Sequence, residues 1–209
     1  MFDAVIFDLD GTLLDTEAVA LRLGHDCLRQ LGHVPDTAVF HAMIGKDGPT
    51  SDALLQAAYP GLDMVQFDRM WRGGFEAALE LDLPLKPHAA EVLAALALPK
   101  ALCTSSRRAS AQRKLALSGL ARHFQTVVAL EDVTRAKPDP EPYLLTARRL
   151  GVSPERCVVF EDSEPGAAAA QAAGCVVVQV PDMLPASGRH AHHVADTLLE
   201  GARKLGLIA

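Results

Sequence analysis

The chain has no apolar run long enough to cross a lipid bilayer. The longest apolar stretch, residues 166–180, is interrupted by Gln171 and Gly174. The first residues, Met-Phe-Asp, lack the basic region that opens a secretory signal. We therefore expect a cytoplasmic protein that makes no contact with a membrane.

The sequence also has no excess of positive charge. A net charge of -6 and a pI near 5.7 offer no basic surface to a nucleic-acid backbone, so a small molecule is the expected partner. Neither a G-x-S-x-G pattern nor a P-loop is present. Their absence disfavours serine hydrolases and ATP-driven enzymes.

Cysteine is scarce and widely spaced. The four residues form no C-x-x-C pair, and three lie in or beside apolar strand-like runs. We interpret them as reduced core residues, with a disulfide framework or a zinc site as the alternatives. They are Cys27, Cys103, Cys157 and Cys175.

Helices and strands alternate along most of the chain. With 209 residues, of which 49% are hydrophobic, the chain can bury one ordinary domain and a smaller one. The alternation predicts an α/β fold with a Rossmann-like parallel sheet. The expected strands are 4–7, 101–103, 126–130, 157–160 and 175–180, with helices at 88–97, 109–118, 141–150 and 167–173.

The region between the first strand and the rest reads as helical throughout. Apolar residues recur at helical spacing over 18–31, 39–43, 52–59 and 64–81, and two prolines follow in a linker over 81–88. We predict a catalytic core of residues 1–14 and 84–209 and a helical cap domain of residues 15–83. A cap inserted there can close over a ligand and exclude water.

The string FDAVIFDLDGT places two acids where the first strand ends. Ala4 to Phe7 reads as a buried parallel strand, and Asp8, Asp10 and Gly11 follow it directly. Ligands of open α/β sheets bind at this carboxyl edge. An ordinary Asp-Gly turn is the alternative, but such a turn has no use for a second acid on its inner side.

Other strand ends carry polar groups of the same kind. Strand 101–103 leads into Thr104, Ser105 and Ser106, whose hydroxyl and N–H groups suit an anion, although helix capping is the alternative. Lys137 precedes the helix that Asp139 is expected to cap, and an isolated loop lysine is usually solvated. The segment FEDSEPG places Glu161, Asp162 and Ser163 after an apolar strand.

Together these groups suit phosphoryl transfer. Asp8 and Asp162, with Glu161 as a further candidate, offer the few hard oxygen ligands that suit Mg²⁺. A carboxylate at 4 Å from a phosphate oxygen meets a repulsion of about 4 kcal/mol per charge pair, which Mg²⁺ and Lys137 would offset. Asp8 can then attack as a nucleophile, and Asp10 can act as acid and base.

The segments DLDGT, CTSS, KPDP and FEDSEPG, in this order, resemble the four motifs of the haloacid dehalogenase-like hydrolases. The similarity extends over nearly the whole chain and is greatest to the sugar-phosphate phosphatase and β-phosphoglucomutase-like branch, which has a helical cap. The resemblance implies Asp8 as nucleophile and Asp10 as acid/base and backbone Mg²⁺ ligand. It implies Thr104 and Lys137 as partners of the phosphate and the nucleophile, and Asp162 as metal ligand.

Several reactions of that family remain to be separated. Asp10 disfavours dehalogenases, which lack it, and phosphonate hydrolases, which replace it. β-Phosphoglucomutase-like enzymes carry a histidine where this chain has Ala20, so we favour a phosphatase over a mutase. Phosphoglycolate phosphatase is a further alternative. The alternative from another class is a non-catalytic phospho-ligand-binding protein, which could have lost the acids that are present here.

The remaining candidates concern the substrate. We expect Gly11 and Ser105 to lie at its phosphate and Lys46, in the cap, to reach its remote end, with a solvated lysine as the alternative. Arg107 and Arg108 are interpreted as solvated charge. The histidine-rich string at 190–193 is interpreted as a polar loop. We expect a monomer that acts on a small phosphate monoester.

Overall fold

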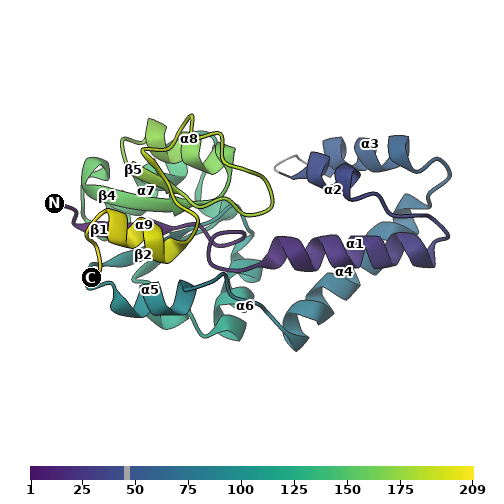
Figure 1. Cartoon of the computed structure of the whole chain (residues 1–209), viewed down its shortest axis with the longest axis horizontal. Helices are drawn as coiled ribbons and strands as arrows, with labels where there is room; N and C mark the ends of the chain where they lie inside the picture. The colour runs from purple at the N-terminus through teal and green to yellow at the C-terminus, as the bar shows by residue number, and fades with distance from the viewer. Residues whose placement is uncertain (45–47) are drawn as a thin grey trace. The chain divides into compact units, whose positions relative to one another are not determined.

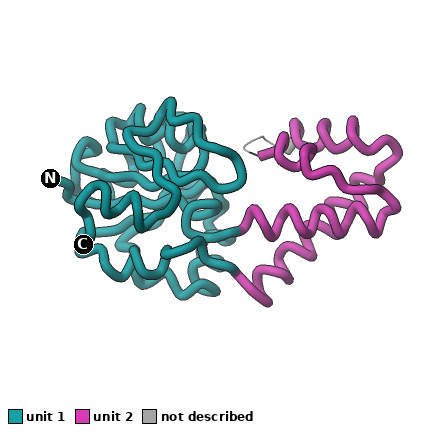
Figure 2. Tube along the Cα trace, viewed as in Figure 1, with its two compact units in different colours: residues 1–15, 84–209 teal, residues 16–83 magenta. Residues whose placement is uncertain are grey.

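The computed structural model describes residues 1–44 and 48–209 and divides into two compact units. Unit 1 contains residues 1–15 and 84–209, and unit 2 contains residues 16–83 (Figure 2). The chain therefore leaves unit 1 after its first strand and returns to it at Pro84.

Unit 1 is built on a parallel sheet, which has six strands within the described residues, in the order β3-β2-β1-β4-β5-β6 (Figure 1). The strand at its centre, β1, pairs with both β2 and β4, so that Val5 lies opposite Lys100 on one side and Val158 on the other. This topology confirms the predicted α/β fold with a Rossmann-like sheet. The strands are β1 (Ala4–Phe7), β2 (Lys100–Cys103), β3 (Thr126–Val128), β4 (Cys157–Glu161), β5 (Val176–Gln179) and β6 (His193–Val194).

Helices cover both faces of the sheet, which explains why its inner strands are apolar without alternation. Ile6, Val159 and Val177 belong to one buried cluster with residues of α7 (Glu141–Leu150) and α8 (Glu164–Ala172). On the other face the rings of Phe7 and Phe160 stack at 5.2 Å, near α9 (Leu198–Lys204), which contacts α5 (Ala89–Ala95). Figure 1 shows α8 and α5 on opposite sides of the sheet.

Unit 2 is helical, as expected for the insertion after the first strand. Its helices are α1 (Thr16–Gln30), α2 (Thr37–Met43), α3 (Gly48–Ala58) and α4 (Met64–Leu81). Two contacts join segments far apart in sequence: the Trp71 indole donates to the Ala20 carbonyl at 3.2 Å, and the Asp36 N–H donates to the Tyr59 hydroxyl at 2.8 Å. An apolar cluster that includes Leu28 and Phe67 lies between these helices.

The structure corrects several element boundaries. The predicted strand 126–130 ends at Val128, because a short 3-10 helix, Leu130–Asp132, begins where the Asp132 carboxylate accepts the Ala129 N–H. The interpretation of 190–193 as a loop is wrong for His193, which begins β6. Further elements are α6 (Arg108–Ser118) and the 3-10 helices Ala121–His123 and Pro154–Arg156.

Two other expectations concern composition. All four cysteines are buried free thiols, as predicted. Within residues 1–44 and 48–209, no helix has both the length and the apolar character that a membrane crossing requires.

His88 precedes α5 in a left-handed backbone conformation, with φ of +64°, the only positive φ outside glycine among the described residues. This conformation disfavours any residue with a Cβ by about 1 kcal/mol relative to glycine. The imidazole Nδ1 lies 2.8 Å from the exposed Glu91 carboxylate, a contact that contributes little.

We therefore predict that His88→Gly is more stable than His88→Ala by about 1 kcal/mol, because both remove the imidazole and only glycine relieves the backbone. Urea unfolding of the two variants measures the difference. Equal stability of the two variants would show that the backbone at residue 88 is not strained.

Candidate active site

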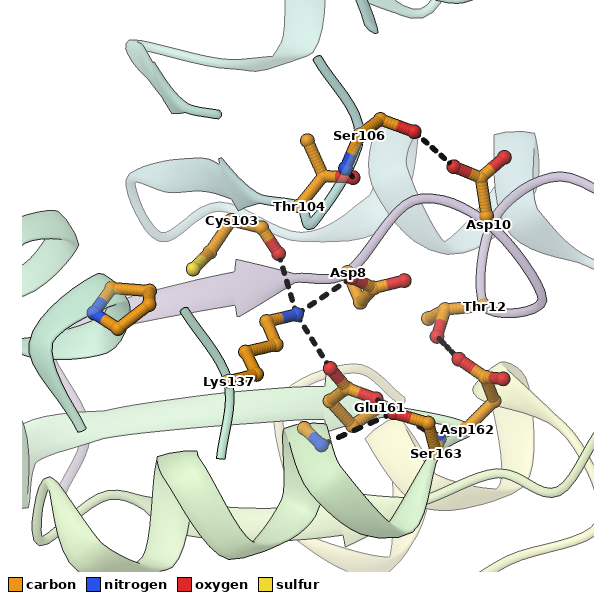
Figure 3. A network of polar contacts seen from close by, with 12 residues as sticks. Asp8, Asp10, Thr12, Cys103, Thr104, Ser106, Lys137, Glu161, Asp162 and Ser163 are labelled. Carbon is orange, nitrogen blue, oxygen red and sulfur yellow. Dashed lines mark hydrogen bonds and ion pairs between the residues drawn. The ribbon is translucent and has the colours of Figure 1, made fainter. Parts of the chain in front are cut away.

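The polar residues predicted at the strand ends lie together at one edge of the sheet. Asp8 follows β1, Thr104 follows β2, and Glu161 ends β4, with Asp162 next to it. Because β1 lies between β2 and β4 and all three run in parallel, their carboxyl ends meet at the same edge (Figure 3).

Lys137 is the cation of this cluster, and it is buried rather than solvated. Its Nζ donates to Asp8 Oδ1 at 2.7 Å, to Glu161 Oε1 at 2.6 Å and to the Cys103 carbonyl at 3.0 Å. Only 5% of its side chain is exposed. The lysine from the loop before α7 thus joins three neighbouring strands through one ammonium group (Figure 3).

Burial and the neighbouring carboxylates change the pKa values of the acids in this cluster. Burial raises the pKa of Asp8 to about 7, against the opposing effect of the Lys137 charge. Burial, together with the charges of Glu161 and Asp8, raises the pKa of Asp162 well above its usual range. Burial alone would lower the pKa of Lys137, but the carboxylates of Asp8 and Glu161 outweigh it and raise that pKa. Three carboxyl groups therefore share one ammonium group, and a further cation would favour their ionised forms.

Glu161 is fully buried and receives four donors. Oε1 accepts from Lys137 and from the Tyr143 hydroxyl at 2.9 Å, while Oε2 accepts from the Ser163 N–H at 3.0 Å and the Ser163 hydroxyl at 2.9 Å. A carboxylate has about four acceptor positions. Protein donors therefore fill the acceptor positions that Glu161 would need for direct contact with a metal. Its clearest structural role is to hold Lys137.

Asp162 is held by the turn that follows Asp10. The Thr12 hydroxyl donates to Asp162 Oδ1 at 2.9 Å. Gly11 has a φ of +82°, and a Cβ on it would lie 2.4 Å from Asp162 Oδ2. Gly11, which we expected at the substrate phosphate, thus lies directly against Asp162 because only a glycine allows that approach.

Three acids have the arrangement of a cation site. One carboxylate oxygen from each of Asp8, Glu161 and Asp162 lies within 4.8 Å of the others. Three hard oxygen donors that share one ammonium group fit Mg²⁺. The Asp10 side chain is not in this group, and the resemblance assigned it a metal contact only through its backbone.

The carboxylate of Asp10 is instead held from the side of α6. The Ser106 hydroxyl donates to Oδ2 at 2.7 Å, and Lys114 Nζ donates to Oδ1 at 2.6 Å. The sequence offers no reason to expect Lys114 at the site, because a lysine in a polar helix is normally solvated. Its only sequence signal is its place in the helix that follows Thr104.

The remaining predicted residues have separate outcomes. Thr104 is buried, and its hydroxyl accepts the Ser106 N–H at 3.0 Å, so it is not the N-cap of α6, which begins at Arg108. Ser105 is exposed in the turn between β2 and α6. Arg108 is not simply solvated, since it forms an ion pair with Asp132. Lys46 lies outside the described residues.

Comparison with known proteins identifies the family. Residues 2–174 match the model of the haloacid dehalogenase-like hydrolases. The chain belongs to this family. It is 36% identical to fructose-1-phosphate phosphatase YqaB of Escherichia coli over 191 residues, which are 86% of this chain and 96% of that protein. It is 31% identical to a phosphorylated carbohydrates phosphatase of Thermotoga maritima over 176 residues, 82% of each.

A solved structure agrees with this assignment. A haloacid dehalogenase family hydrolase from Deinococcus radiodurans, solved with bound phosphate and sodium, superposes with a TM-score of 0.89 at 31% identity and covers 100% of this chain and 98% of its own. This haloacid dehalogenase-like phosphatase therefore has the family's parallel sheet and its helical insertion after β1.

Gly11 provides a test of the turn that holds Asp162 in this phosphatase. We predict that Gly11→Ala loses Mg²⁺-dependent activity by about 10-fold or more, since the new Cβ must displace the Asp162 carboxylate. We also expect Mg²⁺ to raise the Tm of the wild type and to raise the Tm of this variant by less.

Gly119→Ala is the matched control. Gly119 has a φ of +68°, and its Cβ would meet no atom within 4 Å. Both variants carry the same kind of backbone strain, but only the one at Gly11 crowds an acid. An equal loss of Mg²⁺ response in both variants would contradict the assignment.

Proposed function

We propose that this phosphatase hydrolyses small phosphate monoesters, phosphorylated sugars in particular, through a phosphoryl group transferred to Asp8. The observation that carries the proposal is the pairing of a buried Asp8 with Lys137 at 2.7 Å, beside Asp162 at the carboxyl edge of the sheet. A nucleophilic carboxylate needs positive charge around the phosphate that it attacks.

Asp8 and Asp162, with Glu161 nearby, would hold Mg²⁺, which supplies positive charge to the phosphate oxygens when bound. Lys137 holds one oxygen of Asp8 and leaves Oδ2 to attack phosphorus. The Thr104 hydroxyl and the N–H groups of the turn after β2 can donate to the transferring group. Water then hydrolyses the phosphorylated Asp8, and inorganic phosphate leaves.

Asp10 supplies the proton transfers of both steps. As an acid it protonates the ester oxygen as the alcohol departs, and as a base it takes a proton from the attacking water. Its carboxylate lies beside Ser106, two residues from Thr104, and therefore borders the turn that would receive the phosphate.

The sugar-phosphate preference rests on relatives with that activity in their names. The phosphatase is favoured over a mutase because a mutase must keep its phosphorylated aspartate from water, and this chain has Ala20 where such enzymes carry a histidine. We propose that the helical insertion acts as the cap that selects among small esters. Phosphate release without isomerisation of a sugar 1-phosphate would separate the two reactions.

The test of the function is Mg²⁺-dependent phosphate release from p-nitrophenyl phosphate and from a panel of sugar phosphates, phosphoglycolate and nucleotides. Removal of Mg²⁺ with a chelator should abolish turnover, and its return should restore it. A protein that binds phosphate esters without releasing phosphate would instead be a phospho-ligand-binding protein.

Asp8→Asn should keep the fold and lose turnover, because an amide is a poor nucleophile. In the wild type, a fluoroberyllate or fluoroaluminate mimic of phosphate should be found on Asp8 by crystallography. Circular dichroism checks the fold of the variant. Undiminished turnover by Asp8→Asn would exclude Asp8 as the nucleophile.

Asp10→Asn should reduce kcat/KM by about 10² to 10⁴ fold for esters of poor leaving groups. The loss should be smaller for p-nitrophenyl phosphate, whose leaving group departs without protonation. The comparison of p-nitrophenyl phosphate with benzyl phosphate measures this difference. Equal losses on both would rule out Asp10 as the general acid.

A further inference from the structure

Lys114 is a buried cation that neither the family motifs nor the proposed mechanism uses. It lies in α6, ten residues beyond Thr104, with 8% of its side chain exposed. Its Nζ donates to Asp10 Oδ1 at 2.6 Å and to the Ser106 hydroxyl at 3.2 Å. A lysine with so little exposure requires partners that stabilise its charge.

Ser106 completes the arrangement from the same strand-to-helix connection. Its hydroxyl donates to Asp10 Oδ2 at 2.7 Å, so each oxygen of the Asp10 carboxylate has its own donor. Figure 3 shows the Ser106 hydroxyl and the Asp10 carboxylate directed toward each other. The Asp10 side chain remains 25% exposed, so it is held without being closed off from a ligand.

Stability alone does not explain an ammonium group at this position. A buried ion pair is often no more stabilising than apolar side chains of similar volume. Methionine would fill the space of the Lys114 stem and carry no charge. What the ammonium adds is a fixed direction for the carboxylate that it contacts.

We propose that Lys114, together with Ser106, is a positioning residue that orients the Asp10 carboxylate for proton transfer to the leaving group. This inference rests on the proposed function, in which Asp10 is the acid. A carboxylate free to rotate would spend less time in the orientation that meets the ester oxygen, and small misplacements of catalytic groups reduce rates by up to about 10² fold.

The experiment compares Lys114→Met with the wild type on p-nitrophenyl phosphate and benzyl phosphate in saturating Mg²⁺. If Lys114 acts through Asp10, kcat/KM should fall by about 10 to 100 fold for benzyl phosphate and by less than about threefold for p-nitrophenyl phosphate. Lys114→Arg should recover part of the loss, since a cation still reaches the carboxylate.

Lys100→Met is the control. Within the described residues, its Nζ donates to the carbonyls of Leu96 and Leu98. Lys100 begins β2 and therefore lies at the opposite edge of the sheet from Asp10. Both substrates should be hydrolysed by this variant as by the wild type. Ser106→Ala removes the other donor to Asp10, and the same selective loss should appear there even if Lys114→Met fails to fold.

The decisive measurement is the double-mutant cycle with Asp10→Asn. In the Asp10→Asn background, Lys114→Met should change kcat/KM for benzyl phosphate by less than about twofold, because the group that it orients is gone. Equal losses on both substrates, or an unchanged effect of Lys114→Met without Asp10, would overturn the inference. If Asp10→Asn itself retains full activity, the proposed function is at fault instead.

Discussion

The site depends on one ammonium group placed among carboxylates at the end of a buried sheet. Lys137 contacts Asp8, Glu161 and the carbonyl at the end of β2, and nearly all of its side chain is buried. Without a cation there, two buried acids would lie near each other with nothing to offset their repulsion. The carboxylates of Asp8, Glu161 and Asp162 form the group that could hold a divalent cation, and the proposed phosphate site depends on such a cation.

The parallel sheet makes this arrangement possible. Asp8, Thr104 and Glu161 are far apart in sequence, yet they follow or end adjacent strands whose carboxyl ends share one edge. Helices on both faces exclude water from the strands, so the polar residues lie at the carboxyl ends of the strands. Lys137 reaches this edge from the loop before α7, and the Tyr143 hydroxyl of α7 donates a hydrogen bond to Glu161.

Much of this could be predicted from the sequence, because abrupt changes from apolar strand to acid or hydroxyl are local signals. Asp8, Thr104 and Asp162 can be recognised in this way, because each stands at or just after the end of an apolar strand. The role of Lys114 could not be predicted, since its helix is polar and only the packing of α6 brings it to Asp10. Gly11 was singled out from the sequence, but its approach to Asp162 could not be predicted, because a sequence does not reveal which atoms occupy the space that a missing Cβ leaves.

The acids of the site look alike in sequence and differ in what holds them. Asp8 is buried and accepts from Lys137 through one oxygen, an arrangement that suits the proposed nucleophile. Glu161 has a donor for each acceptor position and holds Lys137 in place. Asp10 is partly exposed and is held from α6, which gives it the access that the proposed acid/base role needs. Hydrogen-bond partners, and not residue type, distinguish these acids, so we expect a change at a partner to affect the proposed chemistry as a change at an acid does.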